Sequence, residues 1–353
     1  MYSGKVRCYL RKKAIPYREK YPSIITYKRF ILPRTGVRFI PVLHTPEDQV
    51  LQDTTVIIDA LEARFPELPV YPDTPRQRFV SLLLELFGDE WLLLPAMHYR
   101  WNFPADNDDF LFREFGGLMF PWLPGFVRKK LGRKIARRFQ GYIPMLGITE
   151  QTGPALEAWF EALLADLGRH FEHHLFLLGG RPTLADFAFA GPLYGHLSRD
   201  PYPARLLRAK SPHVMDWIGR MTSTAQFTGP LLPADAIPDS LLPILSRCVL
   251  DQLPYITDTS RSLDKWASGK PAGTLVPRSI GRQPVNINGR TAERLVLPYS
   301  VWMFQRPYDY YRKLTDPERQ PVAELLAGLG GLEPFEEILN TRLDRRGNRT
   351  CLA

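Results

Sequence analysis

Apolar residues along the chain recur mostly at helical spacing. In the segment 151–171 they return every three or four positions, the pattern of a helix that packs one face against a core. The same spacing predicts a long helix over 76–97, which Pro95 is expected to end. The apolar positions of the segment 151–171 are Leu156, Trp159, Phe160, Leu163, Leu164, Leu167 and Phe171. These patterns predict long amphipathic helices in the middle of the chain.

The segment 36–66 carries strand and helix signals in a fixed order. Its first apolar run contains Pro41, which belongs at the end or the edge of a strand because proline lacks a ladder donor. A second short strand is expected over 48–51, and Asp53 or Thr54 then stands at the N-cap of a helix. A capped helix N-terminus suits an anionic, peptide-like ligand. Taken alone, the same residues also describe an ordinary strand–turn–strand–helix unit.

The segment 36–66 resembles the glutathione-binding half of the cytosolic glutathione transferases. The matching motifs are Ile40-Pro41-Val42-Leu43 and Leu51-Gln52-Asp53-Thr54. That family has a thioredoxin-like domain followed by an all-helical domain. The resemblance implies that Ile40, just before Pro41, pairs through its backbone with the cysteinyl part of glutathione. It also implies that Asp53 and Thr54 hold the γ-glutamyl end of glutathione.

The resemblance is strengthened by a second motif, PTLADF at 182–187. Thr183 at the N-cap and Asp186 three residues later predict a capping box, with Asp in the place of Glu. The same box starts a helix in the helical domain of glutathione transferases, where it serves folding, so we assign it no catalytic role. Because both motifs occur in the family's order, the chain is identified as a member of the cytosolic glutathione S-transferase family.

The resemblance and the proline-rich breaks together predict the fold. The fold class is an α/β thioredoxin-like N-terminal domain that lacks its first strand, an all-α glutathione-transferase-type domain, and a mainly helical extension with a β-hairpin. The predicted boundaries are 1–66 for the glutathione-binding domain, 67–75 for the linker, 76–232 for the helical domain and 233–353 for the extension. The extension cannot form much core alone, so we expect it to pack on the helical domain, where it could roof the pocket of the second substrate.

The extension also carries local signals of ordered structure. Asn288-Gly289 predicts the turn of a β-hairpin. Thr315 and Glu318 form a second capping box. A last amphipathic helix is expected over 333–343.

The first residues contain the candidates for the catalytic hydroxyl. We expect a helix that starts at Ser3 as its N-cap, and in the resembled family the activating Ser, Tyr or Cys lies at or just before this start. A helix N-terminus favours a thiolate, and a hydroxyl there can donate to it. The resemblance therefore makes Ser3 the first catalytic candidate and Tyr2 the second, although Ser3 can equally be only a cap. Cys8, well inside the helix, is expected to be a packing residue.

The family's first strand should precede this helix, but only Met1 and Tyr2 stand there. Either the chain is truncated, or its start is assigned wrongly, or the sheet lacks a strand. We favour truncation. In that case the residue that activates the thiol could be missing from this sequence.

A basic amphipathic helix is predicted over 127–139. Its apolar positions repeat every four residues, and basic residues fill its other faces. This pattern is typical of a weak membrane-surface contact or of a site that attracts anionic ligands. It is equally typical of a helix that packs its apolar face within a domain and exposes its basic residues to solvent. One basic helix without a recognisable motif does not indicate a nucleic-acid partner.

Composition narrows the class of protein further. The chain has 353 residues and a formal net charge of +9, which favours acidic small molecules or anionic surfaces. Its three cysteines are an odd number in no metal-like spacing, so a reducing, cytoplasmic compartment is expected. No signal peptide and no membrane span are predicted. His170, His173 and His174 lack further ligands, so we predict a solvated or capping cluster and no metal site.

These observations lead to one functional hypothesis and one alternative. The hypothesis is a glutathione transferase-like enzyme, with a role in detoxification, that uses glutathione thiolate as the nucleophile on an apolar or aromatic electrophile. Whether it conjugates, cleaves ethers, isomerises or reduces stays open, and a homodimer is implied by the resemblance alone. The alternative is a non-catalytic glutathione-transferase-like binding or scaffold protein.

Overall fold

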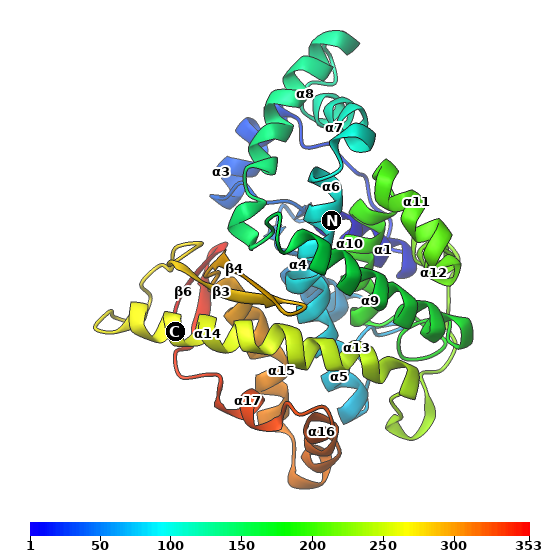
Figure 1. Cartoon of the computed structure of the whole chain (residues 1–353), viewed down its shortest axis with the longest axis vertical. Coiled ribbons are helices and arrows are strands. Elements are labelled where there is room, and N and C mark those ends of the chain that lie inside the picture. Colours follow the sequence, from blue (N-terminus) through cyan, green and yellow to red (C-terminus); the bar gives the residue numbers. More distant parts are fainter.

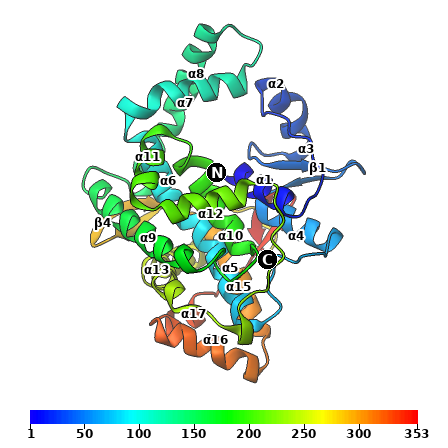
Figure 2. The same cartoon turned by 90° about the vertical axis from the view of Figure 1, so that its right-hand side faces the viewer.

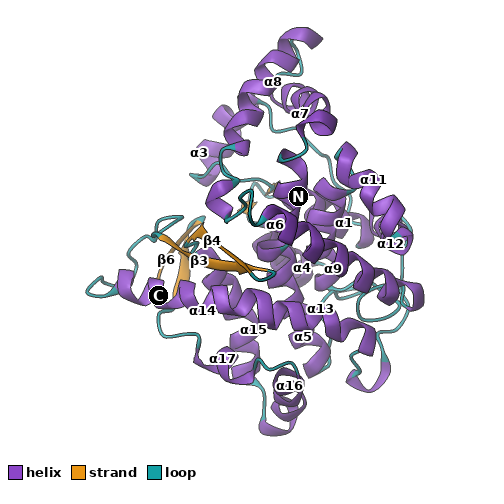
Figure 3. Ribbon diagram, viewed as in Figure 1, coloured by secondary structure: helices purple, strands orange, loops and turns teal.

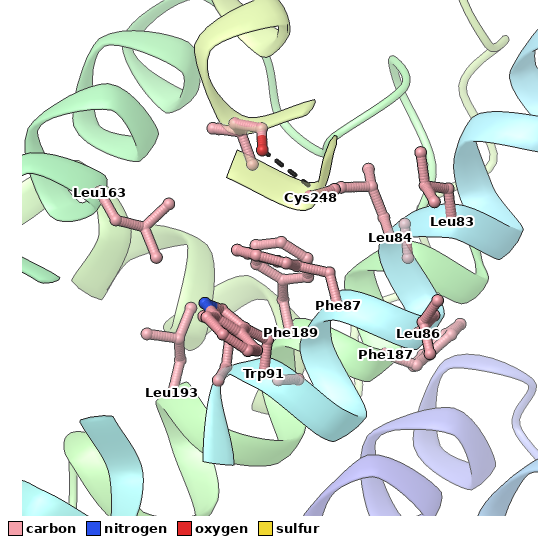
Figure 4. Close-up of a cluster of buried hydrophobic side chains, with 14 of the residues drawn as sticks. Leu83, Leu84, Leu86, Phe87, Trp91, Leu163, Phe187, Phe189, Leu193 and Cys248 are labelled. Atoms are coloured by element: carbon pink, nitrogen blue, oxygen red, sulfur yellow. Dashed lines mark hydrogen bonds between the residues drawn. The ribbon is translucent and has the colours of Figure 1, made fainter. Parts of the chain in front are cut away.

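The computed structural model describes all residues from Met1 to Ala353. Helices dominate it, and its strands form three separate two-stranded antiparallel hairpins (Figure 3). A single hydrophobic cluster of 67 buried residues takes members from the N-terminal region, the central helices and the C-terminal extension. Part of this cluster, where Phe87, Phe189 and Cys248 meet, is drawn in Figure 4. The extension therefore shares the main core of the protein.

The N-terminal region has four helices and one hairpin. The hairpin register pairs Val42 with Gln52 and His44 with Val50, and the Ile40–Pro41 peptide bond is cis. The sheet of the thioredoxin-like domain thus consists of two strands, and no strand precedes α1, as the predicted fold class has it. The elements are α1 (Tyr2–Lys12), α2 (Ile24–Thr26), α3 (Leu32–Thr35), β1 (Val42–His44), β2 (Val50–Gln52) and α4 (Thr54–Arg64).

The central region is entirely helical, and its first long helix differs from the prediction. In place of one helix over 76–97, a π-helical turn at Phe87–Trp91 separates α5 from α6. Pro95 lies in the first turn of α6, where its missing N–H costs no helical hydrogen bond. Gly88 in the π-turn lies so close to α10 that an added Cβ would be 2.9 Å from the Ala188 carbonyl carbon. The helices are α5 (Pro75–Leu86), α6 (Leu93–Trp101), α7 (Pro104–Met119), α8 (Gly125–Gln140), α9 (Gly153–His173), α10 (Leu184–Pro192), α11 (Pro201–Lys210) and α12 (Pro212–Thr222).

The predicted capping box at the start of α10 is confirmed. Both Oδ atoms of Asp186 accept hydrogen bonds: Oδ2 from the backbone N–H and the hydroxyl of Thr183, at 2.9 and 3.0 Å. Oδ1 accepts from the Leu177 N–H at 3.0 Å and from the Trp217 indole at 3.1 Å. The carboxyl group therefore caps α10 and also ties it to α12 and to the loop before it.

The structure of the extension agrees with the local sequence signals as far as the start of its last helix. The Asn-Gly hairpin and the Thr315–Glu318 capping box are confirmed. The helix predicted over 333–343 is confirmed in its first part, but its predicted end is wrong, because α17 ends at Glu337 and a third hairpin follows. The backbone of Leu343 instead bonds the side-chain amide of Gln305, at 2.7 and 2.8 Å. The elements are α13 (Leu242–Arg247), α14 (Leu253–Ala267), β3 (Arg282–Ile287), β4 (Arg290–Leu295), α15 (Tyr299–Lys313), α16 (Asp316–Gly328), α17 (Leu332–Glu337), β5 (Leu343–Arg346) and β6 (Arg349–Leu352).

The extension contacts both earlier parts of the chain. Helices α15 and α16 pack against α5 of the central region. The turn after β5 reaches the N-terminal region, where the side-chain amide of Asn348 donates to the carbonyl oxygen of Thr35 at 2.8 Å. The four domain boundaries given above stay predictions.

We predict that Asp186→Ala lowers the free energy of unfolding by about 3 kcal/mol, because the substitution leaves several buried donors without an acceptor. The matched control is Asp216→Ala, an exposed position on α12, which should change stability by less than about 0.5 kcal/mol. Chemical denaturation of both variants measures the difference. Equal stability of the two variants would show that the buried carboxyl group is not a structural anchor.

Candidate functional site

The predicted glutathione-binding residues lie together at one end of the first hairpin. The register pairs Val42 with Gln52, so Pro41 and Asp53 each come one residue beyond this pair. Asp53 is the N-cap of α4, and its Oδ1 atom accepts the Thr55 N–H at 3.0 Å. The structure therefore brings Ile40-Pro41 and Asp53-Thr54 to the same end of the hairpin, as the resemblance implies.

Asp53 also has two partners from the C-terminal extension. The Tyr299 hydroxyl on α15 donates to Asp53 Oδ2 at 2.6 Å. The Arg345 guanidinium on β5 lies 3.0 Å from the same oxygen, and only 12% of either side chain is exposed. Nothing in the sequence indicated this contact, because Tyr299 is 246 positions away from Asp53 and carries no motif. The extension thus covers the N-terminus of α4.

The first helix starts earlier than predicted. Its N-cap is Met1, whose carbonyl oxygen accepts the Gly4 N–H at 2.8 Å. The expectation that Ser3 is the N-cap is therefore wrong, and Ser3 lies half-buried in the first turn. Its proposed catalytic role stays a prediction.

Tyr2, the second catalytic candidate, lies next to buried acidic residues. Its hydroxyl donates to the carbonyl oxygen of Asp89 at 3.0 Å. Burial raises the pKa of Tyr2 well above its usual value, and the charges of Glu90, Asp89 and Asp53 add to the effect. The phenol therefore keeps its proton at neutral pH and can act only as a hydrogen-bond donor or acceptor.

Cys8 is a packing residue, as expected. Its side chain is fully buried, and burial raises the pKa of its thiol to about 12. It is therefore a thiol and not a thiolate at neutral pH.

A buried ion network lies beneath the candidate site. Lys5 Nζ on α1 is 2.8 Å from Glu85 Oε1 and 2.6 Å from Asp89 Oδ2, and these side chains are almost completely buried. The Thr55 hydroxyl donates to Glu85 Oε1 at 2.9 Å, and Arg306 Nε of α15 donates to Oε2 at 3.1 Å. Glu85 therefore links four helices: α1, α4, α5 and α15.

The ionisation of this network follows from its charges. Burial disfavours the charged form of Glu85, but the nearby charges of Lys5 and Arg306 outweigh it and hold the pKa of Glu85 at about 2. Burial raises the pKa of Asp89 to about 7, against the attraction of Lys5. At neutral pH Glu85 is therefore the fully ionised partner of Lys5 and Arg306, and Asp89 is partly protonated.

Arg306 forms a second bridge from the extension to α4. Its guanidinium donates two parallel hydrogen bonds to the carboxylate of Asp59, at 2.7 and 3.1 Å. The same guanidinium donates to the Tyr71 hydroxyl at 2.8 Å, and that hydroxyl donates to Asp59. Bidentate pairs of this kind fix orientation as well as distance. Helix α4 is therefore bound to α15 at its N-cap and again one to two turns later.

Two family models match the chain. The model of the glutathione S-transferase N-terminal domain matches residues 1–69, and that of the C-terminal domain matches residues 154–220. The two matched segments contain the two motifs and occur in the family's order. The chain belongs to the glutathione S-transferase family. The residues 70–153 and 221–353 lie outside both matches, so the covering extension is not part of either family domain.

Three solved structures of glutathione S-transferases or similar proteins resemble parts of the chain. One, from Methylobacterium radiotolerans in complex with glutathione sulfonate, has 20% identity and a TM-score of 0.37 over 65% of this chain and 92% of that chain. A glutathione transferase from Phanerochaete chrysosporium has 16% identity and a TM-score of 0.40 over 64% of this chain and 91% of that chain. A GST-like protein from Pseudomonas syringae has 17% identity and a TM-score of 0.35 over 82% of this chain and 90% of that chain. No curated protein matched the sequence.

The two best-formed hollows of this glutathione S-transferase family member each have a volume of about 10 Å³, which is room for one water molecule. Neither is lined by Ile40, Pro41, Asp53 or Thr54. Pockets for drug-sized ligands are far larger, roughly 300 Å³ or more. Neither of these two hollows is large enough for an apolar second substrate, and the pocket expected beneath the extension stays a prediction.

The histidines at the end of α9 differ from the prediction in the burial of one of them. His170 is fully buried, and its Nδ1 atom is 2.9 Å from the Ser240 hydroxyl. Its ring stacks on His174 with centroids 4.8 Å apart. The prediction of a solvated cluster is thus wrong for His170, which packs in the core.

We predict that Glu90 makes the stability of this transferase-family protein depend on pH. Burial, and then the charge of Asp89, raise the pKa of Glu90 to about 8, so the folded state binds this proton more tightly than the unfolded state does. The stabilisation is full below about pH 4 and is lost as the pH rises towards 8. The loss should be roughly 3 kcal/mol between pH 5 and 9.

Glu90→Gln should make the free energy of unfolding less dependent on pH between pH 5 and 9, because the amide has the same shape as the carboxyl group and carries no charge. Glu172→Gln, at an exposed position of α9, is the matched control and should leave the profile unchanged. Chemical denaturation across this pH range measures all three proteins. A profile for Glu90→Gln parallel to that of the wild type would contradict the assignment.

Proposed function

We propose that the protein binds glutathione at the junction of β2 and α4 and uses its thiolate as the nucleophile on an apolar or aromatic electrophile. The observation that carries the proposal is the Asp53 carboxylate at the N-cap of α4, beside Ile40-Pro41. Membership of the family supports it, because the N-terminal domain match contains all four residues. Glutathione supplies the nucleophilic sulfur, and the protein supplies orientation and charge.

The chemistry of Asp53 fits a ligand with an ammonium group. In the described conformation Asp53 Oδ2 already accepts from the neutral hydroxyl of Tyr299 and pairs with the positive Arg345. A carboxylate in this position therefore recognises a cation, and the γ-glutamyl end of glutathione carries one. Thr54 is the first residue of α4, and the backbone of Ile40 is proposed to pair with the cysteinyl part.

The catalytic hydroxyl is proposed to be that of Ser3 or Tyr2 in the first turn of α1. A helix N-terminus stabilises a thiolate through its dipole, and a protonated hydroxyl can donate to the sulfur. The raised pKa of Tyr2 keeps its hydroxyl protonated, and to donate to the sulfur this hydroxyl would turn from the Asp89 carbonyl oxygen. Which reaction follows — conjugation, ether cleavage, isomerisation or reduction — stays open, as do the homodimer and a role in detoxification. The three free cysteines suit a reducing compartment such as the cytoplasm.

The contact between Arg345 and Asp53 favours a second candidate function. Tyr299 donates a hydrogen bond to Oδ2 of the Asp53 carboxylate, and Arg345 forms an ion pair with the same oxygen. A protein in which this contact is permanent would be a non-catalytic member that binds or organises partners. The two candidates differ in one respect: only the enzyme must release Asp53 to glutathione.

We predict that the wild-type protein binds glutathione with a dissociation constant between micromolar and millimolar values, and that Asp53→Ala weakens binding at least tenfold. The physical reason is the loss of the carboxylate that pairs with the ligand's ammonium group. Isothermal titration calorimetry measures both proteins. Asp73→Ala, which removes an exposed carboxylate of the linker, is the control and should bind like the wild type.

Because Asp53 also caps α4, its variants are compared only where their unfolding transitions show a folded protein. Asp53→Asn retains much of the cap and loses the charge, so it separates folding from ligand binding. If the folded wild type binds no glutathione at millimolar concentration, the enzyme proposal fails and the non-catalytic function replaces it.

We also predict that Arg345→Met strengthens glutathione binding about three- to tenfold. Its guanidinium competes with the ammonium group of glutathione for Asp53 Oδ2, and removing a competitor leaves the binding-competent state more populated. Arg346→Met removes the exposed neighbouring charge and serves as the control. Weaker binding by Arg345→Met would show that Arg345 contacts the ligand and does not compete with it.

A further inference from the structure

Helices α7 and α8 form a hairpin that stands out at one end of the long axis of the molecule (Figures 1 and 2). Their backbones are in direct contact at two glycines. A Cβ added to Gly116 would lie 2.1 Å from the carbonyl oxygen of Arg128, and one added to Gly132 would lie 2.0 Å from that of Phe112. No larger residue fits at either position without moving a helix. The hairpin, which lies outside both family-domain matches, is therefore a tightly packed unit.

Helix α8 carries an excess of positive charge. It contains seven basic residues and no acidic residue. Lys129 pairs with Asp109 of α7, and Arg137 pairs with Asp108 at 2.9 Å. The acidic residues Asp106 and Glu114 of α7 are paired with arginines of other segments. The basic residues of α8 without a carboxylate partner are Arg128, Lys130, Arg133, Lys134 and Arg138.

Large aromatic side chains are exposed beside this charge. Trp122 lies in the turn between the two helices and is 51% exposed, and Phe126 in the first turn of α8 is 79% exposed. Phe139 and Tyr142, at the other end of α8, are 44% and 50% exposed. Exposed apolar surface with a polar rim is a mark of protein–protein or membrane contact sites.

The apolar stripe predicted for this helix is not a core face. Its four positions are Val127, Leu131, Ile135 and Phe139. Val127, Leu131 and Ile135 are half-buried and Phe139 is exposed, while the fully buried residues of α8 are Gly132 and Ala136 against α7. The interpretation of α8 as a domain helix with basic residues on its solvated side stays a prediction, and the exposed Phe139 is the part of the stripe that it does not explain.

We propose that the α7–α8 hairpin docks the protein on an anionic lipid surface. Exposed Trp and Phe side chains insert at the boundary between headgroups and acyl chains, and unpaired Lys and Arg attract anionic headgroups. The contact lies at the surface of the bilayer, because no helix of the chain combines the length and apolar character needed to cross it. A second copy of the hairpin is a poor occupant, because two helices with this charge repel each other.

The proposal goes beyond the glutathione site and does not depend on it. It is tested by flotation of the full-length protein with vesicles of phosphatidylcholine alone and of phosphatidylcholine with 30% phosphatidylserine, at 0.1 M and 0.5 M NaCl. We expect binding to the anionic vesicles at 0.1 M NaCl that falls at least tenfold at 0.5 M NaCl, since salt screens the attraction.

Two sets of variants locate the contact. Lys130→Glu with Lys134→Glu, both exposed and without carboxylate partners, should lower the bound fraction at least tenfold. Arg312→Glu with Lys313→Glu, exposed at the end of α15, makes the same change in net charge and should bind like the wild type. Trp122→Ala with Phe126→Ala should lower the bound fraction about threefold or more without changing the net charge.

Several results would overturn the proposal. Equal binding to both kinds of vesicle, or equal loss in both charge-reversed variants, would remove the case for a specific anionic lipid contact. Tighter binding to a duplex DNA oligonucleotide than to anionic vesicles at the same salt, lost in the α8 variant, would assign the surface to nucleic acid. Circular dichroism and the unfolding midpoint of each variant confirm that the compared proteins are folded.

Discussion

The carboxylate of Glu85 is the interaction on which the arrangement of the site depends. The carboxylate is completely buried. It accepts one hydrogen bond from each of three other helices, with Lys5 of α1, Thr55 of α4 and Arg306 of α15 as the donors. A buried charge is tolerated only when such partners surround it, so these helices cannot shift independently. The network fixes α4, and with it Asp53, relative to the first helix and to the extension.

The extension is therefore a structural part of the candidate site. The same helix α15 that reaches Glu85 through Arg306 reaches Asp53 through Tyr299, about two helical turns earlier. The last hairpin adds Arg345 to the same carboxylate. In this member of the glutathione S-transferase family, access to the proposed glutathione site is a property of residues outside both family domains. An enzyme built this way must exchange a contact within the chain for a contact with its ligand.

The sequence predicts the features that short-range hydrogen bonds determine. It does not predict the features that depend on contacts between residues far apart in the chain. Asp53 at its N-cap, the capping boxes at Thr183 and Thr315, and the Asn288-Gly289 turn all follow from short-range hydrogen bonding and are confirmed. The π-turn after α5 was missed because the close approach of Gly88 to α10 is a long-range contact. The last helix was predicted to continue to residue 343 because the Gln305 amide that binds the backbone of Leu343 lies 38 residues away in the sequence. Tyr299 and Arg345 could not be found as site residues, since their role depends entirely on packing.

The most direct measurement of the central claim is the crystal structure of the wild-type protein with saturating glutathione. The account predicts density for the tripeptide at the junction of β2 and α4, with its ammonium group on Asp53, its cysteinyl backbone beside Ile40, and Arg345 displaced from the carboxylate. Density for glutathione elsewhere, or an empty junction with Arg345 and Tyr299 still bound to Asp53, would contradict it.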